Sequence, residues 1–158
     1  MTNSGENTLR LQENEILLVL AEKTRLGEVL ESLGVGRIEK KESGEPALPG
    51  SPYFISFSHK DDMAVAAISD SAVGVDIENV TVPRNIQRLS RLFHESEVPE
   101  SLYDFYRLWT SKEAIGKQSG TGITFDVLKQ KSTDVRHLDH GDYIICVAGK
   151  GEITMKVY

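Results

Sequence analysis

The chain has 158 residues, of which 39% are hydrophobic and 27% are charged, and its formal net charge at pH 7 is −6. These values are typical of a soluble globular protein, and the acidic balance argues against a bulk electrostatic grip on nucleic acid. The single cysteine, Cys146, excludes an internal disulfide framework and indicates a reducing compartment. Residues 1–6 carry no secretory pattern, and no apolar run approaches the roughly 20 residues of a membrane span. We therefore expect a cytoplasmic protein without nucleic-acid or membrane partners.

The first half of the chain has the patterns of a small sheet with one helix. Residues 58–62 are polar and predict a turn between two strands. In chain order we expect a polar tail (1–13), a buried strand (16–20), a helix ending at Gly34 (24–33), a loop (35–52) and an antiparallel meander (53–57, 63–69 and 73–78).

The second half changes to helical spacing and then returns to strands. A short helix is expected over 85–93 and a long one over 102–118, with Ser101 as its N-cap and Asp104 as its capping-box partner. The remaining segments predict strands near 124–131, 133–138, 142–148 and 152–157. The predicted fold class is α+β, with antiparallel sheets packed against one long helix. Cys146 falls in an apolar run, which favours a buried strand cysteine over a nucleophile.

The strand over 73–78 carries two carboxylates on one face. Because side chains alternate along a strand, Asp76 and Glu78 point one way, roughly 6–7 Å apart at the backbone. Val75 and Ile77 point the other way. An amphipathic strand with a solvated acidic face explains this pattern, and so does one half of a metal site.

The long helix adds a third carboxylate. An apolar stripe runs along it at helical spacing, formed by Leu102, Phe105, Tyr106 and Trp109. Four residues further on, the same line reaches Glu113, whose charge needs a partner if it is desolvated. One candidate is Lys117, four residues along the helix. The other is a divalent cation such as Mg²⁺, shared with Asp76 and Glu78.

Three motifs follow one another along the chain: Phe57-Ser58-His59, Gly74-Val75-Asp76-Ile77-Glu78, and Trp109-Thr110-Ser111-Lys112-Glu113-Ala114-Ile115-Gly116-Lys117. In this order they resemble the 4′-phosphopantetheinyl transferase superfamily, and the similarity covers about residues 44–158. The tail through Met155 is similar to the surfactin-type branch. The resemblance implies one domain over 1–158 with two pseudo-symmetric lobes, a reduced amino-terminal lobe (1–72) and a carboxy-terminal lobe with the metal-site motifs (73–158).

The resemblance gives the acidic residues their roles. Asp76, Glu78 and Glu113 match the family's magnesium ligands. Glu113 also matches the usual candidate for receiving the proton of the attacking serine, directly or through water. Glu97 matches a further acidic position near the metal, and a solvated carboxylate at a helix end is the alternative.

The resemblance also assigns the contacts to coenzyme A. Lys117 matches a lysine that contacts the pyrophosphate, His59 a histidine that contacts the phosphates, and Ser58 a position near the 3′-phosphate. The implied reaction is phosphoryl transfer, with Glu113, Lys117 and His59 as catalytic residues, Mg²⁺ as cofactor and coenzyme A as substrate. A serine of an acyl or peptidyl carrier protein attacks the β-phosphorus, and 3′,5′-ADP leaves. The sequence leaves the oligomeric state open.

The chain departs from the family pattern at Glu45. Family members commonly have a basic residue between Gly and Pro at this point, whereas the sequence here is Gly44-Glu45-Pro46. A carboxylate repels the 3′-phosphate, so another cation must replace the missing one, or coenzyme A is held less tightly. The candidates for that replacement are Arg37, Lys40, Lys41 and Lys60.

Alternatives stay open for the partner surface and for the activity. Arg84, Arg88 and Arg91 recur at helical spacing and, with Arg107, form either a docking patch for an acidic carrier protein or an ordinary solvated face. Glu45 and the shortened first half favour a second hypothesis, a family member that binds a carrier protein or coenzyme A without transfer. A magnesium-dependent phosphohydrolase shares the carboxylates but leaves the motif from Trp109 to Lys117 unexplained.

Overall fold

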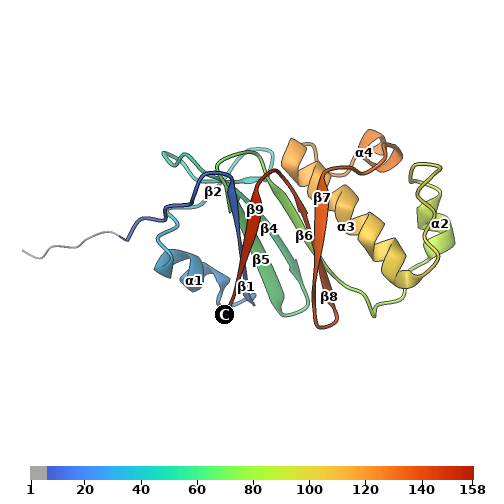
Figure 1. Cartoon of the computed structure of the whole chain (residues 1–158), viewed down its shortest axis with the longest axis horizontal. Helices are drawn as coiled ribbons and strands as arrows, with labels where there is room; N and C mark the ends of the chain where they lie inside the picture. The colour runs from blue at the N-terminus through green and yellow to red at the C-terminus, as the bar shows by residue number, and fades with distance from the viewer. Residues whose placement is uncertain (1–6) are drawn as a thin grey trace, which may run out of the picture.

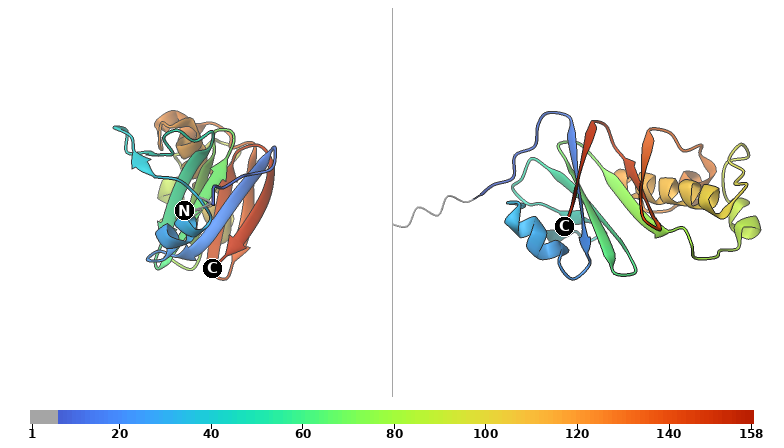
Figure 2. Two further views of the ribbon diagram at one scale, coloured as in Figure 1. Left: turned by 90° about the vertical axis from the view of Figure 1, so that its left-hand side faces the viewer. Right: turned by 60° about the horizontal axis from the view of Figure 1, so that its bottom comes forward.

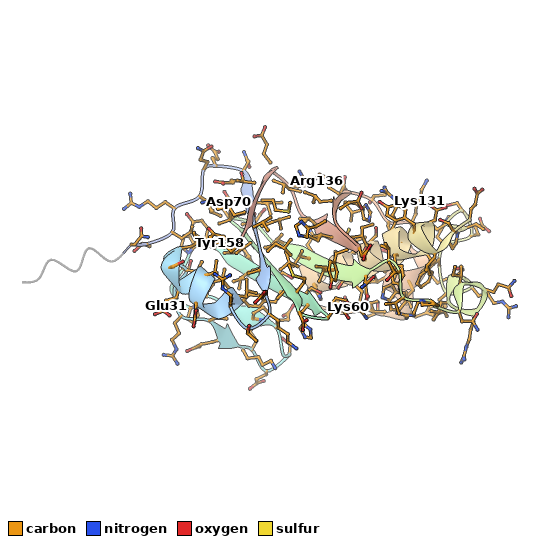
Figure 3. All side chains as sticks on the ribbon, turned by 90° about the horizontal axis from the view of Figure 1, so that it is seen from below. Glu31, Lys60, Asp70, Lys131, Arg136 and Tyr158 are labelled. Atoms are coloured by element: carbon orange, nitrogen blue, oxygen red, sulfur yellow. The ribbon has the colours of Figure 1, made fainter. Side chains whose placement is uncertain are left out.

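The structure, a computed structural model that describes residues 7–158, arranges most of its strands in two larger sheets between helices at opposite ends (Figure 1). Helix α1 (Leu26–Ser32) lies at one end and α2 (Ile86–Ser90) at the other, as the right-hand view of Figure 2 also shows. In Figure 3, Glu31 and Lys131 mark these two ends, and Lys60 lies between them. Of the predicted tail over 1–13, residues 1–6 lie outside the described residues, and residues 7–13 form no helix or strand.

The first sheet has the strand order β4-β5-β1-β9. Strand β5 (Met63–Ser69) pairs antiparallel with both β4 (Phe54–Lys60) and β1 (Glu15–Glu22). Strand β9 (Glu152–Val157) pairs parallel with β1, so the sheet is mixed. Both faces of β1 are apolar because each one is covered. Leu17 and Val19 belong to the core that includes α1 residues, and Ile16, Leu18 and Leu20 belong to the core shared with the second sheet.

The second sheet is antiparallel with the strand order β6-β8-β7, formed by β6 (Gly74–Asn79), β8 (Tyr143–Ala148) and β7 (Val135–His140). Val75 and Ile77 pack against the first sheet, which confirms the predicted alternation along this strand. The predicted meander is wrong, however, because β6 pairs with β8 and not with β5. The apolar face of β6 packs against the first sheet, but β6 forms its strand pairing in the second sheet. An apolar pattern therefore does not show which sheet a strand joins.

Helix α3 (Leu102–Ser119) has the predicted N-cap, since Ser101 Oγ accepts a hydrogen bond from the Asp104 amide at 3.0 Å. The Asp104 carboxylate accepts from the Glu100 amide at 3.2 Å, so its return contact is one residue away from that of a capping box. Strand β6 lies very close to α3 at Gly74. A Cβ on Gly74 would lie 1.9 Å from the Ala114 carbonyl oxygen, so only glycine fits there.

Four other segments differ from prediction. Residues 124–131 contain α4 (Phe125–Lys129) in place of a strand, because Thr124 Oγ1 caps the Val127 amide at 3.2 Å and starts a helix. Strand β4 continues through Ser58 and His59, so the turn shortens to Asp61 and Asp62. The predicted loop over 35–52 contains a small hairpin of β2 (Glu39–Lys40) and β3 (Pro46–Ala47). Helix α2 is shorter than the predicted 85–93.

Strands β4 and β6 lie side by side where the two sheets meet, and we call this junction the seam. Two serine hydroxyls of β4 accept hydrogen bonds from β6 amides, Ser56 from Val75 at 3.1 Å and Ser58 from Ile77 at 3.2 Å. Side chains therefore join the two sheets at the seam. No helix within residues 7–158 combines the length and apolarity needed to cross a bilayer.

Candidate active site

Asp76 lies at the centre of the site, on the face of β6 turned toward α3. It is only 5% exposed. Its Oδ1 accepts from Ser58 Oγ at 2.9 Å and lies 3.4 Å from Lys117 Nζ, whereas its buried Oδ2 has no hydrogen-bond partner within residues 7–158. Burial raises the pKa of Asp76 to about 7; Lys117 opposes this rise, and the charges of Glu113 and Glu78 add to it.

Glu78 and Glu113 are the other two predicted acids. Glu78 Oε2 is buried and accepts no hydrogen bond from the described residues, although Lys60 Nζ lies 3.4 Å away as an ion-pair partner. Burial raises the pKa of Glu113; Lys117 counteracts this, Glu78 raises it further and Arg84 lowers it. Because each of these acids raises the pKa of Asp76, all three carboxylates lie within electrostatic reach of one another.

The fit of these acids to a metal ion depends on what else would coordinate it. Among residues 7–158, no group of three or more His, Cys, Asp or Glu side chains is arranged so that it could hold a metal ion. Mg²⁺ is typically held by one or two carboxylates, with waters and substrate phosphates completing its shell. Asp76 Oδ2 and Glu78 Oε2, which accept no hydrogen bond from the described residues, are therefore donors of the kind that such an ion requires, and Glu113 carries a third carboxylate nearby. The residues present fit Mg²⁺.

Lys117 crosses from α3 to the seam. Its Nζ donates to the carbonyl oxygens of Phe57 at 3.1 Å and Val75 at 3.0 Å, and it contacts Asp76 Oδ1 at 3.4 Å. No ion pair joins Lys117 to Glu113 in the part of the chain that the structure describes. Lys117, one of the two partners proposed for Glu113, thus contacts the seam carbonyls and Asp76 instead.

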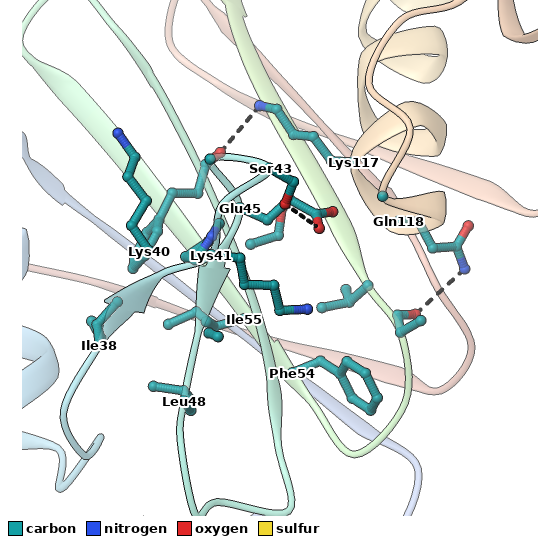
Figure 4. Close-up of a pocket in the computed structure, with 18 of the residues that line it drawn as sticks. Ile38, Lys40, Lys41, Ser43, Glu45, Leu48, Phe54, Ile55, Lys117 and Gln118 are labelled. Carbon is teal, nitrogen blue, oxygen red and sulfur yellow. Dashed lines mark hydrogen bonds between the residues drawn. The ribbon is translucent and has the colours of Figure 1, made fainter.

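A cleft of about 1010 Å³ opens beside Lys117 (Figure 4). The hairpin of β2 and β3, the first half of β4 and the end of α3 enclose it, and the lining residues are 38–41, 43–48, 51–57, 72–73 and 117–122. Lys40, Lys41 and Glu45 line the same cleft as Lys117. The volume and the three lysines suit a ligand with phosphate groups.

Glu45 stands where the family commonly has a basic residue, and only some of the four cations proposed to replace that residue line the cleft. Lys40 and Lys41 line it, whereas Arg37 pairs with Glu39 at 2.7 Å and Lys60 pairs with Glu78. The Glu45 carboxylate accepts from Ser43 Oγ at 3.1 Å and lies against Gly120, at the end of α3. The structure therefore leaves two of the four candidates in reach of a ligand in the cleft.

Ser58 and His59 point to opposite faces of β4, since they are neighbours on a strand. Ser58 is 9% exposed, and its hydroxyl contacts Asp76 and the Ile77 amide. His59 is exposed, its side chain forms no hydrogen bond or ion pair within residues 7–158, and it is not among the residues that line the cleft. The structure brings Ser58 to the acids and leaves the His59 side chain free.

The sequence does not identify Arg84 as a neighbour of the acids. Its guanidinium lies 5.2 Å from the centroid of the Trp109 ring and 5.8 Å from that of Phe105. Its charge lowers the pKa of Glu113, so it lies close to the carboxylate cluster. The only sequence signal was its place in the predicted basic patch. The remaining members of that patch, Arg88, Arg91 and Arg107, are exposed.

Glu97 is occupied by partners other than a metal ion. Its Oε1 lies 2.6 Å from Nζ of Lys112, whose side chain is fully buried, and its Oε2 accepts from the Ser132 amide at 3.1 Å. Although burial raises the pKa of Glu97, these hydrogen bonds lower it below its ordinary value overall. Lys112 Nζ also donates to the Gln130 carbonyl. The solvated-carboxylate alternative for Glu97 is wrong, since the residue is buried.

One buried and two half-buried carboxylates between a strand and a long helix, next to a cleft with lysines, form a site whose chemistry suits a phosphorylated ligand. Comparison with known proteins agrees with this class of site. The family model described as "4'-phosphopantetheinyl transferase superfamily" matches residues 72–153, which include Asp76, Glu78, Glu113 and Lys117. The chain belongs to this superfamily.

Several curated relatives carry the same family name. 4'-phosphopantetheinyl transferase psf-1 of Bacillus pumilus is 32% identical over 127 residues, 68% of this chain and 54% of that protein. Sfp of Bacillus subtilis strain 168 is 28% identical over 66% of this chain and 54% of its own. AcpT of Salmonella typhi is 36% identical over 58% of this chain and 53% of its own. The chain spans about half the length of the curated relatives it matches.

Proposed function

We propose that the chain is a magnesium-dependent 4′-phosphopantetheinyl transferase, which moves the 4′-phosphopantetheine group of coenzyme A to a serine of an acyl or peptidyl carrier protein. The observation that carries this proposal is the pair of buried carboxylate oxygens on Asp76 and Glu78 that accept no hydrogen bond from the described residues, beside a cleft that Lys117 lines. The names of the matched relatives support the reaction class. Asp76, Glu78 and Glu113 would hold Mg²⁺, which when bound offsets negative charge on the pyrophosphate.

In this proposal the chain's residues position the reactants and move one proton. The carrier serine oxygen attacks the β-phosphorus, its bond to phosphorus forms as the bridging P–O bond breaks, and 3′,5′-ADP leaves. Glu113 receives the serine proton directly or through water, and its raised pKa suits a general base. Lys117 would redirect an N–H donor from the seam carbonyls to the pyrophosphate.

Coenzyme A would occupy the cleft, with Lys40 and Lys41 near its phosphates in place of the residue lost at Glu45. His59 stays a predicted phosphate contact, and its exposed, unpaired side chain leaves it free for that role. The predicted contact of Ser58 with the 3′-phosphate also stays untested, since its hydroxyl contacts Asp76 here. The division into two pseudo-symmetric lobes, 1–72 and 73–158, is part of the same proposal.

The partner surface and the location follow from the same proposal. The exposed Arg88, Arg91 and Arg107 provide a basic face for an acidic carrier protein. The cytoplasmic location rests on the single cysteine, Cys146, which is buried and unpaired.

The direct test is incubation of the protein with coenzyme A, Mg²⁺ and an apo carrier protein. Mass spectrometry should detect a carrier heavier by one 4′-phosphopantetheine group, and chelation of the metal should abolish it. Glu113→Gln should slow the transfer by at least about 100-fold, because a general base contributes roughly that much. Glu28→Gln removes the same charge from the exposed face of α1 and should retain activity. Unmodified carriers throughout would refute the proposal.

Glu45 keeps the second candidate open, a family member that binds without transfer. Its carboxylate lines the cleft in which a phosphate would lie. Calorimetry that detects coenzyme A or carrier binding, combined with no mass change of any carrier, would select this function.

A further inference from the structure

Two serines of β4 occupy equivalent places along the seam. The amides of Val75 and Ile77 face away from β8, the only strand among residues 7–158 with which β6 pairs. Ser56 Oγ accepts from the first amide at 3.1 Å and Ser58 Oγ from the second at 3.2 Å. The two serines are 4% and 9% exposed. Both therefore satisfy buried amides that have no partner in a sheet, which is a structural role they share.

Ser58 makes one contact that Ser56 does not. Its hydroxyl donates to Asp76 Oδ1 at 2.9 Å while it accepts from the Ile77 amide. Since the amide proton occupies one lone pair of the serine oxygen, the hydroxyl proton remains available for the carboxylate. Lys117 Nζ contacts the same Oδ1 at 3.4 Å. Both partners of the carboxylate thus lie on one oxygen, and the buried Oδ2 accepts no hydrogen bond from the part of the chain that the structure describes.

We propose that Ser58 is a positioning residue, which holds the Asp76 carboxylate in the orientation that presents Oδ2 to a divalent cation. This inference rests on the proposed function, because it concerns the cation that the transfer reaction requires. Hydrogen bonds to a metal ligand fix its orientation, and their loss typically lowers metal affinity 10- to 100-fold. The role differs from a contact between Ser58 and the 3′-phosphate, in which the hydroxyl would turn toward the ligand and away from Asp76.

The test uses Mn²⁺ as the probe, titrated into the full chain without coenzyme A and followed by electron paramagnetic resonance. Ser58→Ala should weaken Mn²⁺ binding by about tenfold or more. Ser56→Ala is the matched control, because it removes the same kind of hydrogen bond to β6 without touching Asp76. It should leave Mn²⁺ affinity within about twofold. Both variants should unfold at lower urea concentration than the wild type, and Ser58→Ala should be affected more, because it loses two hydrogen bonds where Ser56→Ala loses one.

Each outcome separates the inference from the proposed function. Equal loss of Mn²⁺ affinity in Ser56→Ala and Ser58→Ala, or no loss in either, would overturn the positioning role. A loss of coenzyme A affinity in Ser58→Ala with unchanged Mn²⁺ affinity would assign the residue to the 3′-phosphate instead. Asp76→Asn should abolish Mn²⁺ binding. If it binds Mn²⁺ as the wild type does, or if the wild type binds none, the metal site of the proposed function fails, and the inference fails with it.

Discussion

Asp76→Asn should make the metal-free protein more stable at neutral pH. In the folded chain burial raises the pKa of Asp76 from 3.8 to about 7. At pH 8 the folded state must therefore hold a charge that burial disfavours. Asparagine resembles the protonated acid and can still accept from Ser58, so the substitution removes this penalty.

The magnitude follows from the same shift. A change of about three powers of ten in proton affinity corresponds to about 4 kcal/mol. Because the value of about 7 already includes the opposing charge of Lys117, we expect a rise of at most about 4 kcal/mol in the free energy of unfolding. In Asp76→Asn, Lys117 keeps its hydrogen bonds to the carbonyl oxygens of Phe57 and Val75.

The direction in which stability changes with pH follows from the same raised pKa. The folded protein keeps the Asp76 proton up to about pH 7, whereas the unfolded chain loses it near pH 3.8. This contribution to stability is complete below pH 3.8 and is lost as pH rises through the folded-state value of about 7. The raised pKa of Glu113 acts in the same direction. Asp76→Asn should therefore flatten the decline in stability between pH 4 and 7.

Urea unfolding in the presence of a chelator, at several pH values, measures both effects. Asp70→Asn is the control, because Asp70 is exposed and its replacement should change the stability by less than about 0.5 kcal/mol. Added Mg²⁺ should stabilise the wild type and leave the Asp76 variant unchanged. An Asp76→Asn protein that is no more stable than the wild type at pH 8, with an unaltered pH profile, would refute the reasoning.

Three further predictions concern packing, a buried charge and ligand specificity. Gly74→Ala should lower the free energy of unfolding by about 3 kcal/mol, because its Cβ would meet the backbone of α3. Gly27→Ala, whose Cβ would have nothing within 4 Å, should raise it by about 0.5–1 kcal/mol. Equal urea midpoints for the two variants would contradict this. Lys112→Met should cost about 3–5 kcal/mol because it leaves Glu97 buried and unpaired, and adding Glu97→Gln should recover part of the loss; a double variant no more stable than the single one would argue against the pairing. Glu45→Lys should tighten coenzyme A binding about tenfold, or 1.4 kcal/mol, without affecting 3′-dephospho-coenzyme A; calorimetry that finds both ligands equally affected would exclude a 3′-phosphate contact.

Local patterns were sufficient wherever the outcome depends on a few neighbouring residues. Alternation along β6 places Asp76 opposite Val75 whatever sheet the strand joins, and Ser101 caps α3 through an amide three residues away. The line from the apolar stripe to Glu113 also depends only on helical spacing, and it leads to a half-buried carboxylate beside the other acids.

The rest required partners that are distant in the sequence. The apolar residues over 124–131 fit a short strand as well as a short helix, and the Thr124 cap decides for the helix. Nothing near Lys112 in the sequence indicates that Glu97 and Gln130 surround it in the folded chain. The contact of Ser58 with Asp76 depends on how the two sheets meet, which no local pattern specifies.

The parallel pairing of β1 with β9 affects how the chain can fold during synthesis. Glu15 lies opposite Glu152, so β1 leaves the ribosome long before its second neighbour β9 is synthesised. Pairings between such distant segments slow folding, because a long loop must close before any contact compensates for it. Nascent chains that stall before residue 152 would expose the apolar edge of β1, and are where we expect chaperone binding or aggregation.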